Sequence, residues 1–194
     1  VGRMPKETVL KGQYIWLAVT LGLLVLPLLI GIERGGARSW FYIGPVSVQP
    51  SELAKITFLL FMVSWYKNAR VPNGRNVLIL LSGVLAVLLV LVKQVDLGGA
   101  LIFYSIFIII MYLSTGKRSW AIIGLVMLVV AGLAAYYSFG HVRVRVQTWW
   151  DPWSDPQYGG YQLIQALGAF AAGGWWGTGL GGGQPYTIPA AHTD

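Results

Sequence analysis

Long apolar runs dominate this chain and constrain its fold more than any motif does. Five such runs follow one another, at residues 14–30, 53–66, 77–92, 97–113 and 120–137. A helix needs about 20 residues to cross the hydrocarbon core of a bilayer. The Pro-Ser-Glu sequence at residues 50–52 extends the second run, because proline and acidic residues both suit the first turn of a helix. The sequence therefore predicts five membrane-spanning helices, the first of them kinked at Pro27.

The composition excludes a soluble domain. Hydrophobic residues make up 56% of the chain and charged residues 11%, a balance that would expose large apolar patches in water. The predicted fold class is all-α: a polytopic membrane helical bundle at residues 1–137, then an extracytoplasmic segment at 138–194 with a short membrane-surface helix at 163–172. Since the chain starts with Val1 and stops in a loop at Asp194, we expect it to be a fragment of a longer membrane protein. Cysteine is absent, so neither a disulfide framework nor a thiolate site is expected.

Basic residues are concentrated in alternate inter-helix segments, and this pattern indicates an orientation. Eight of the fourteen Lys and Arg residues share one side of the membrane with a single acid, Glu7. These bases are Arg3, Lys6, Lys11, Lys67, Arg70, Arg75, Lys117 and Arg118. The positive-inside rule places this side, and the N-terminal end, in the cytoplasm. The net charge of +7 is thus a topology signal and does not indicate nucleic-acid binding.

Two pairs of charged residues lie at the predicted extracytoplasmic ends of the helices. Glu52 and Lys55 are three residues apart and share a helix face, and Lys93 and Asp96 flank a break between two apolar runs. Charge at membrane depth is costly unless it is paired or faces a cavity. The Glu52 and Lys55 pair can be a purely structural ion pair, or it can form the polar wall of a cavity that opens outward.

The segment after residue 138 is rich in tryptophan, glycine and Asp-Pro pairs. Tryptophans beside a membrane are most often interfacial anchors, and Asp-Pro pairs are most often turns. The glycine-rich stretch at 173–183 lacks the Gly-Lys-Ser/Thr ending of a phosphate-binding loop. The chain ends in His192, Thr193 and Asp194, residue types that suit loop capping or metal binding when considered alone.

Many short motifs, in register along essentially the whole chain, resemble the SEDS family of FtsW, RodA and SpoVE. They are Gly36-Ala37-Arg38-Ser39-Trp40, Gly44-Pro45, Gln49-Pro50-Ser51-Glu52-Leu53-Ala54-Lys55, Asp96-Leu97-Gly98, Arg145 with Asp151-Pro152, Gly160-Tyr161-Gln162 with Gln165, Gly173-Gly174 with Gly177-Thr178-Gly179-Leu180-Gly181, and Pro189 with His192-Thr193-Asp194. Each motif alone is modest, but their order along the chain is specific to the family.

The resemblance implies a bundle of about ten spans in the cytoplasmic membrane that polymerises lipid II into peptidoglycan glycan strands, in division or elongation. It implies a class B penicillin-binding protein as partner beside the membrane lipids, and it assigns the role of catalytic carboxylate to Asp194, which can take the proton of the acceptor hydroxyl. We further expect Arg38, Lys93 and Arg145 to stabilise the leaving pyrophosphate. Glu52, Lys55 and Asp96 are candidate substrate-binding residues that line the outer end of a cavity. No cofactor or metal site is predicted, and a requirement for a divalent cation is left open.

Two features depart from the family pattern, and two other functions compete with polymerisation. Val95 stands where the family usually has proline, and Trp175-Trp176 stands where a single or smaller aromatic residue is common. The competing functions are a lipid II flippase and a non-catalytic scaffold that recruits a transpeptidase. A flippase needs a polar path to both faces, whereas the polar intramembrane residues here lie near one face.

Overall fold

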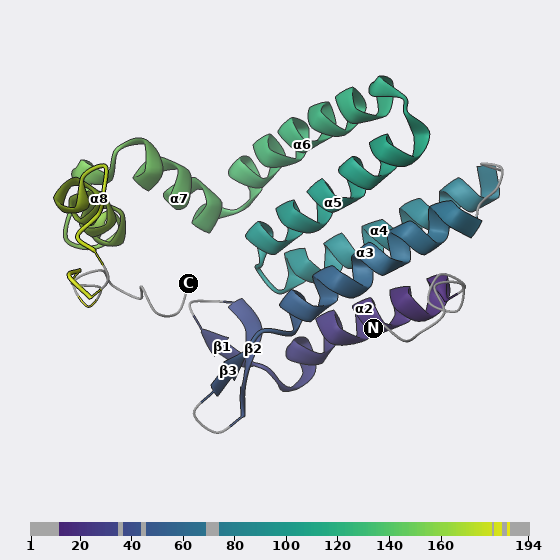
Figure 1. The fold of residues 1–194 in the computed structure, drawn as a ribbon, viewed down its shortest axis with the longest axis horizontal. Coiled ribbons are helices and arrows are strands. Elements are labelled where there is room, and N and C mark those ends of the chain that lie inside the picture. Colours follow the sequence, from purple (N-terminus) through teal and green to yellow (C-terminus); the bar gives the residue numbers. More distant parts are fainter. Residues whose placement is uncertain are drawn as a thin grey trace. The chain divides into compact units, whose positions relative to one another are not determined.

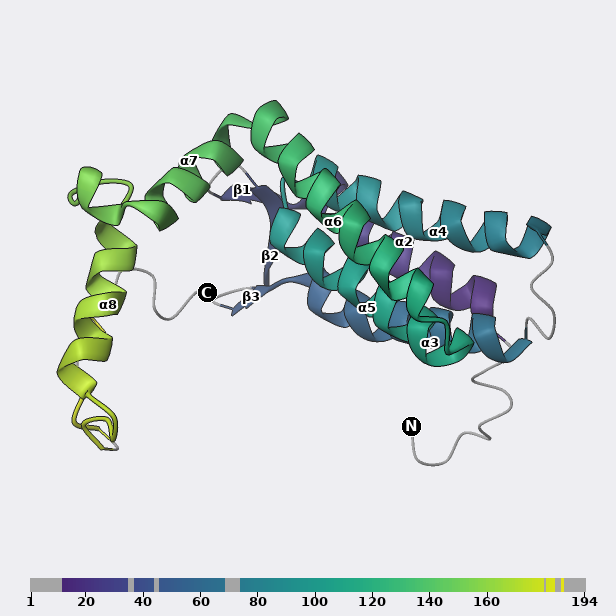
Figure 2. The same ribbon diagram turned by 90° about the horizontal axis from the view of Figure 1, so that it is seen from above.

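The computed structural model describes residues 12–34, 37–43, 46–68, 74–179, 181–183 and 186. The chain divides into two compact units, Val1–Gly124 and Leu125–Asp194. The helices of the first unit are α2 (Gln13–Ile30), α3 (Pro50–Asn68), α4 (Gly74–Lys93), α5 (Leu97–Thr115) and the start of α6 (Arg118–Ser138). Figures 1 and 2 show α2 to α5 lying side by side, with a small sheet at one end of them. The predicted helical class is confirmed.

The five helices coincide with the five predicted apolar runs. Among the described residues, α2, α4, α5 and α6 are the four helices long and apolar enough to cross a membrane. Helix α3 carries three charged residues, Glu52, Lys55 and Lys67, and it contributes the fully buried Phe58, Phe61 and Met62 to the core. Its assignment as the fifth span stays a prediction.

The core of the first unit forms where α3 packs against α2, α4 and α5. Phe58 of α3 contacts Phe103 of α5 with ring centroids 5.1 Å apart, and Leu24 of α2 and Val87 of α4 are fully buried around them. The Thr20 and Thr57 hydroxyls share a hydrogen bond of 2.8 Å between α2 and α3. Because these groups satisfy one another, two polar side chains are accommodated in an apolar interior.

The segment between α2 and α3, whose content of Gly, Arg and Trp predicts a loop, is a three-stranded antiparallel sheet. Its strands are β1 (Ile32–Arg34), β2 (Ala37–Ile43) and β3 (Val46–Val48), in the order β1-β2-β3. The β2 strand pairs with β1 through Trp40 opposite Ile32, and with β3 through Ile43 opposite Val46. The aromatic and β-branched residues of β2 favour a strand, and this signal outweighs the glycines that suggested a loop.

Helix α4 ends in a Schellman motif that sets the direction of the turn into α5. The backbone N–H of Asp96 donates to the carbonyl of Leu91 at 3.0 Å, and that of Val95 donates to Val92 at 3.0 Å. These are the two bonds of the motif, whose C′ residue adopts a left-handed conformation and is usually glycine. Here it is Val95, with φ of 62°. A β-branched residue in this region is strained.

The same turn explains the departure from the family pattern at Val95. Proline fixes φ near −65° and has no N–H, so it fits neither the φ of Val95 nor the hydrogen bond to Val92. This chain therefore makes the α4–α5 turn with a helix cap that proline cannot form. Asp96 is positioned by the cap bond rather than by a rigid proline.

The second unit contains α7 (Gly140–Trp150), the short 3₁₀ helix η1 (Pro152–Ser154) and α8 (Tyr161–Gly173). Helix α8 contains the short helix predicted at 163–172. Helix α7 was not predicted, because Val and Arg alternate from Val142 to Val146 and that period is typical of a strand. Between η1 and α8, a Cβ on Gly160 would lie 2.0 Å from the Pro152 carbonyl oxygen, so this close approach of backbone requires glycine.

We predict that replacing Val95 with glycine stabilises the protein and that replacing it with proline destabilises it. Glycine removes a steric cost of about 1–2 kcal/mol at a left-handed residue, whereas proline loses both the φ and the N–H of the cap. The measurement is the thermal unfolding midpoint in detergent by tryptophan fluorescence. A Val92→Gly variant, inside α4, is the control and should lower the midpoint. Equal midpoints for native protein and Val95→Gly would contradict the strained cap.

Candidate functional site

The first candidate site lies at the sheet end of the first unit, where α3 begins. The Lys55 ammonium Nζ lies 2.6 Å from Glu52 Oε2, one helical turn along α3. The Lys55 side chain is 26% exposed and that of Glu52 is 62% exposed. The pair therefore forms as expected, and it is open to solvent on the Glu52 side. An exposed pair of this kind contributes little to stability, so its charges remain available to a ligand.

The carboxylate of Asp96 caps α5 at the same end of the unit. Asp96 Oδ1 accepts a hydrogen bond from the Gly99 N–H at 2.8 Å. This is an N-cap, which satisfies one of the free donors of the first turn and places negative charge at the positive end of the helix dipole. A Cβ on Gly99 would lie 2.5 Å from Asp96 Oδ2, so the glycine makes room for the capping carboxylate. Substrate binding by Asp96 stays a prediction.

A buried amide holds the turn that carries Asp96. Gln94 is 1% exposed, and its Nε2 donates to the backbone carbonyl of Leu24 in α2. Leu24 lies beside Leu23, whose carbonyl loses its intrahelical donor because Pro27 has no N–H. Gln94 Oε1 is buried without a hydrogen-bond partner. The α4–α5 turn is thus tied to α2 at Leu24.

Two further predicted cations, Lys93 and Arg38, belong to elements at this end, and the side chain of only the first is described. Lys93 ends α4 and is exposed. Arg38 lies in β2, and its side chain lies outside the described residues. The hydrogen bonds and ion pairs of the described residues do not join the Glu52 and Lys55 pair to Asp96 or Lys93. The sheet end therefore carries two separate polar groups, one on α3 and one on the α4–α5 turn.

The second candidate site is a hollow in the second unit, between α7 and α8. It measures about 490 Å³ and is lined by Arg145, Thr148 and Trp149 of α7 and by Gln162 and Leu163 of α8. The Trp149 side chain is 70% exposed. A cation, an indole face, a hydroxyl and an amide in one open hollow can bind a sugar phosphate, through charge, ring stacking and hydrogen bonds.

Asp194, the predicted catalytic residue, lies outside the described part of the chain together with His192 and Thr193. Asp194 and its neighbours are therefore not placed against either candidate site. In the described ranges, no three His, Cys, Asp or Glu residues are grouped as a metal site.

Gln94 and Ser39 were not singled out from the sequence. Ser39, in β2, is buried with its hydroxyl unpartnered. The position of Gln94, two residues after an apolar run, is a sequence feature that could have drawn attention to it. The carbonyl to which it donates depends on how α2 packs. Thr148 and Trp149 were not predicted to line a site together, because α7 was not predicted from the alternating Val and Arg residues that precede them.

Comparison with known proteins places the chain in a family. The model of the FtsW, RodA and SpoVE family, described as "Cell cycle protein", matches residues 1–194. The chain belongs to this family. It is a multi-pass membrane protein of the helical type predicted above.

Named relatives agree with the family match. The chain is 40% identical over 176 residues to a peptidoglycan glycosyltransferase RodA of Mycobacterium leprae, covering 84% of this chain and 38% of that protein. It is 37% identical over 188 residues to a probable peptidoglycan glycosyltransferase FtsW of Nitrosococcus halophilus, covering 93% of this chain and 48% of that protein. The chain thus spans less than half the length of these two curated relatives.

A solved structure shares the fold. It is titled "Structural coordination of polymerization and crosslinking by a peptidoglycan synthase complex", and one of its chains superposes with a TM-score of 0.64 at 29% identity. The match covers 84% of this chain and 49% of that one.

We predict that Asp96→Asn preserves the stability of the protein, whereas Asp96→Ala lowers it by about 1 kcal/mol. Asparagine is as good an N-cap as aspartate, and alanine provides no acceptor. The measurement is the unfolding midpoint of both variants. Because the amide keeps the cap and removes the charge, the Asp96→Asn variant separates the capping role of Asp96 from a role of its charge. An Asp96→Asn variant as unstable as Asp96→Ala would contradict the cap.

Proposed function

We propose that this chain is part of a peptidoglycan glycan-strand polymerase, which transfers glycosyl units from lipid II at the outer face of the cytoplasmic membrane. The observation that carries the proposal is the family match over residues 1–194. Relatives that are 40% and 37% identical are named peptidoglycan glycosyltransferases, the second as a probable one. The chain is therefore proposed to be a glycosyltransferase for cell division or elongation.

The distribution of polar groups supports an enzyme over a lipid II flippase. In the first unit, α3 and α5 both begin at the sheet end (Figure 1), and these helix starts carry the Glu52 and Lys55 pair and the capping Asp96. Between that end and the other, the packed rings of Phe58, Phe61 and Phe103 fill the space among α2 to α5. Within the described part of this unit, the packed core offers no polar path of the kind that a headgroup transporter needs.

The chemistry follows from the residue types. In glycosyl transfer, the acceptor 4-hydroxyl attacks the anomeric carbon of the donor, the bond to the pyrophosphate breaks, and a base takes the hydroxyl proton. We propose Asp194 as that base, on the family motif. Cationic side chains stabilise the charge that develops on the leaving pyrophosphate, and we propose Arg145 in the α7–α8 hollow, with Lys93 and Arg38, for this role.

The remaining proposals concern the orientation of the chain in the membrane, the entry of the substrate and the partner protein. The sheet end and residues 138–194 face the extracytoplasmic side and the N-terminal end faces the cytoplasm, on the distribution of basic residues. Glu52 and Lys55 line the entry for the lipid II headgroup. A class B penicillin-binding protein is the proposed partner, because the matched solved structure is titled as a complex that couples polymerisation to crosslinking.

The test is polymerisation of lipid II by the intact protein together with its transpeptidase partner. Native protein should produce glycan strands on a gel, and Asp194→Asn should lower the rate by at least about 100-fold, since general base catalysis contributes roughly that factor or more. Asp155→Asn is a matched control, because that carboxylate accepts a hydrogen bond from the Gly159 N–H at 3.0 Å within its own loop.

Three outcomes are distinguishable. Strands from native protein but not from a folded Asp194→Asn variant support the polymerase. Undiminished strands from Asp194→Asn contradict Asp194 as the base. If native protein makes no strands but moves lipid II across liposome membranes, the flippase replaces the polymerase.

A further inference from the structure

A cavity lies at the end of the first unit opposite the sheet. It measures about 410 Å³ and lies between α3 and α4 on one side and the α5–α6 turn on the other. This volume is within the range of small-molecule sites. No residue that lines this cavity has a role in the function proposed above.

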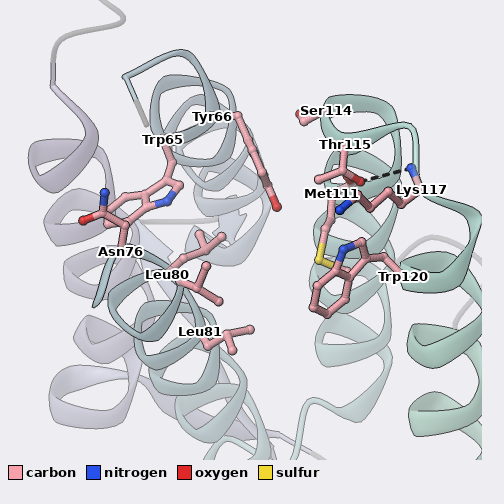
Figure 3. Close-up of a pocket in the computed structure, with 11 residues that line it drawn as sticks. Trp65, Tyr66, Asn76, Leu80, Leu81, Met111, Ser114, Thr115, Lys117 and Trp120 are labelled. Atoms are coloured by element: carbon pink, nitrogen blue, oxygen red, sulfur yellow. Dashed lines mark hydrogen bonds between the residues drawn. The ribbon is translucent and has the colours of Figure 1, made fainter. Parts of the chain in front are cut away.

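The cavity has an apolar wall and a polar rim. Leu80 and Leu81 of α4 face Met111 of α5 across it (Figure 3). Leu80 and Met111 are 5% and 8% exposed, whereas Leu81 is 45% exposed, so the apolar wall is continuous with the exposed surface of α4. An acyl chain can therefore enter from the side of the bundle.

The rim carries a cation and a hydroxyl. Lys117 lies in the α5–α6 turn, and its backbone N–H donates a hydrogen bond to the Thr115 hydroxyl at 3.4 Å. In Figure 3 its side chain extends back beside Met111, and the Tyr66 hydroxyl of α3 faces the same gap from the opposite wall. An ammonium and a phenol hydroxyl are both hydrogen-bond donors, and both suit a phosphate oxygen.

Among the residues that the structure describes, the charged side chains of the helix ends and turns at this end are basic. Lys67 lies in the last turn of α3, Arg75 in the first turn of α4, and Arg118 at the start of α6. The sequence has no Asp or Glu between Glu52 and Asp96, nor between Asp96 and Asp151. Basic pockets between membrane helices on the cytoplasmic side are suited to anionic lipid headgroups, and Trp120 on the rim is a residue type that favours the headgroup region.

We propose that this cavity binds an anionic phospholipid, with the phosphate at Lys117 and Tyr66 and one acyl chain along Leu80, Leu81 and Met111. The basic rim favours an anionic phospholipid over an apolar protein segment, because a phosphate can pair with the Lys117 ammonium while one acyl chain covers the apolar wall. The positive-inside rule places the ligand in the cytoplasmic leaflet, across the membrane from the proposed chemistry.

The experiment is native mass spectrometry of the purified protein in detergent, titrated with phosphatidylglycerol or with phosphatidylcholine. Native protein should retain one phosphatidylglycerol in preference to phosphatidylcholine. Lys117→Gln should weaken this binding about fivefold, the effect of removing one basic residue near an anionic lipid surface. Leu81→Trp, which fills the cavity, should abolish it.

Two matched controls separate the cavity from its surroundings. Lys67→Gln removes a charge at the same end, but Lys67 does not line the cavity. Leu85→Trp enlarges an exposed residue one turn further along α4, also outside the cavity. Both controls should bind phosphatidylglycerol within twofold of native protein, which also shows that the substitutions preserve the fold.

Equal binding by native protein, Lys117→Gln and Leu81→Trp would overturn the proposal, since the lipid then sits elsewhere or the cavity is covered by protein. Equal retention of phosphatidylcholine and phosphatidylglycerol would overturn the anionic specificity. Equal weakening by Lys67→Gln and Lys117→Gln would also overturn the site, because it would reduce the effect to diffuse attraction between basic residues and the bilayer.

Discussion

The hydrogen bond from Gln94 to the Leu24 carbonyl is the interaction on which the sheet end of the molecule depends. It is buried, where a lost partner costs about 1–3 kcal/mol, and it joins the α4–α5 turn to α2 beside Pro27. The α4–α5 turn positions Asp96, whose carboxylate caps α5. A chain of local contacts thus connects the first helix to the carboxylate that caps α5.

The apolar middle of the first unit separates two polar ends. At one end lie the ion pair of α3, the sheet and the α4–α5 turn, and at the other lies a basic rim around an apolar cavity. The packed rings of α3 and α5 keep these ends apart. Because different residues form the two ends, the proposed chemistry at the sheet end and the proposed lipid contact at the opposite end can be altered separately, and the two proposals can fail independently.

The helices were predictable because each apolar run is long and bounded by charge, and the spacing of Glu52 and Lys55 was enough to predict their ion pair. The sheet was missed because β2 lies among glycines, and α7 was missed because alternating Val and Arg imitate a strand. The strained cap at Val95 and the partner of Gln94 depend on tertiary packing, which no local pattern specifies. Asp194 and the side chain of Arg38 lie outside the described residues, so their roles stay predictions.

Hydrogen exchange of the native protein and a Gln94→Leu variant, followed by mass spectrometry, tests the dependence on Gln94 most directly. Gln13→Leu is the control, since Gln13 accepts a bond from Asn68 Nδ2 at 2.8 Å at the other end of the unit. We expect Gln94→Leu to raise exchange about tenfold or more at Gly99 and Ala100, the start of α5, because local opening there loses its buried anchor. Exchange at these amides that is unchanged from native protein would contradict the account.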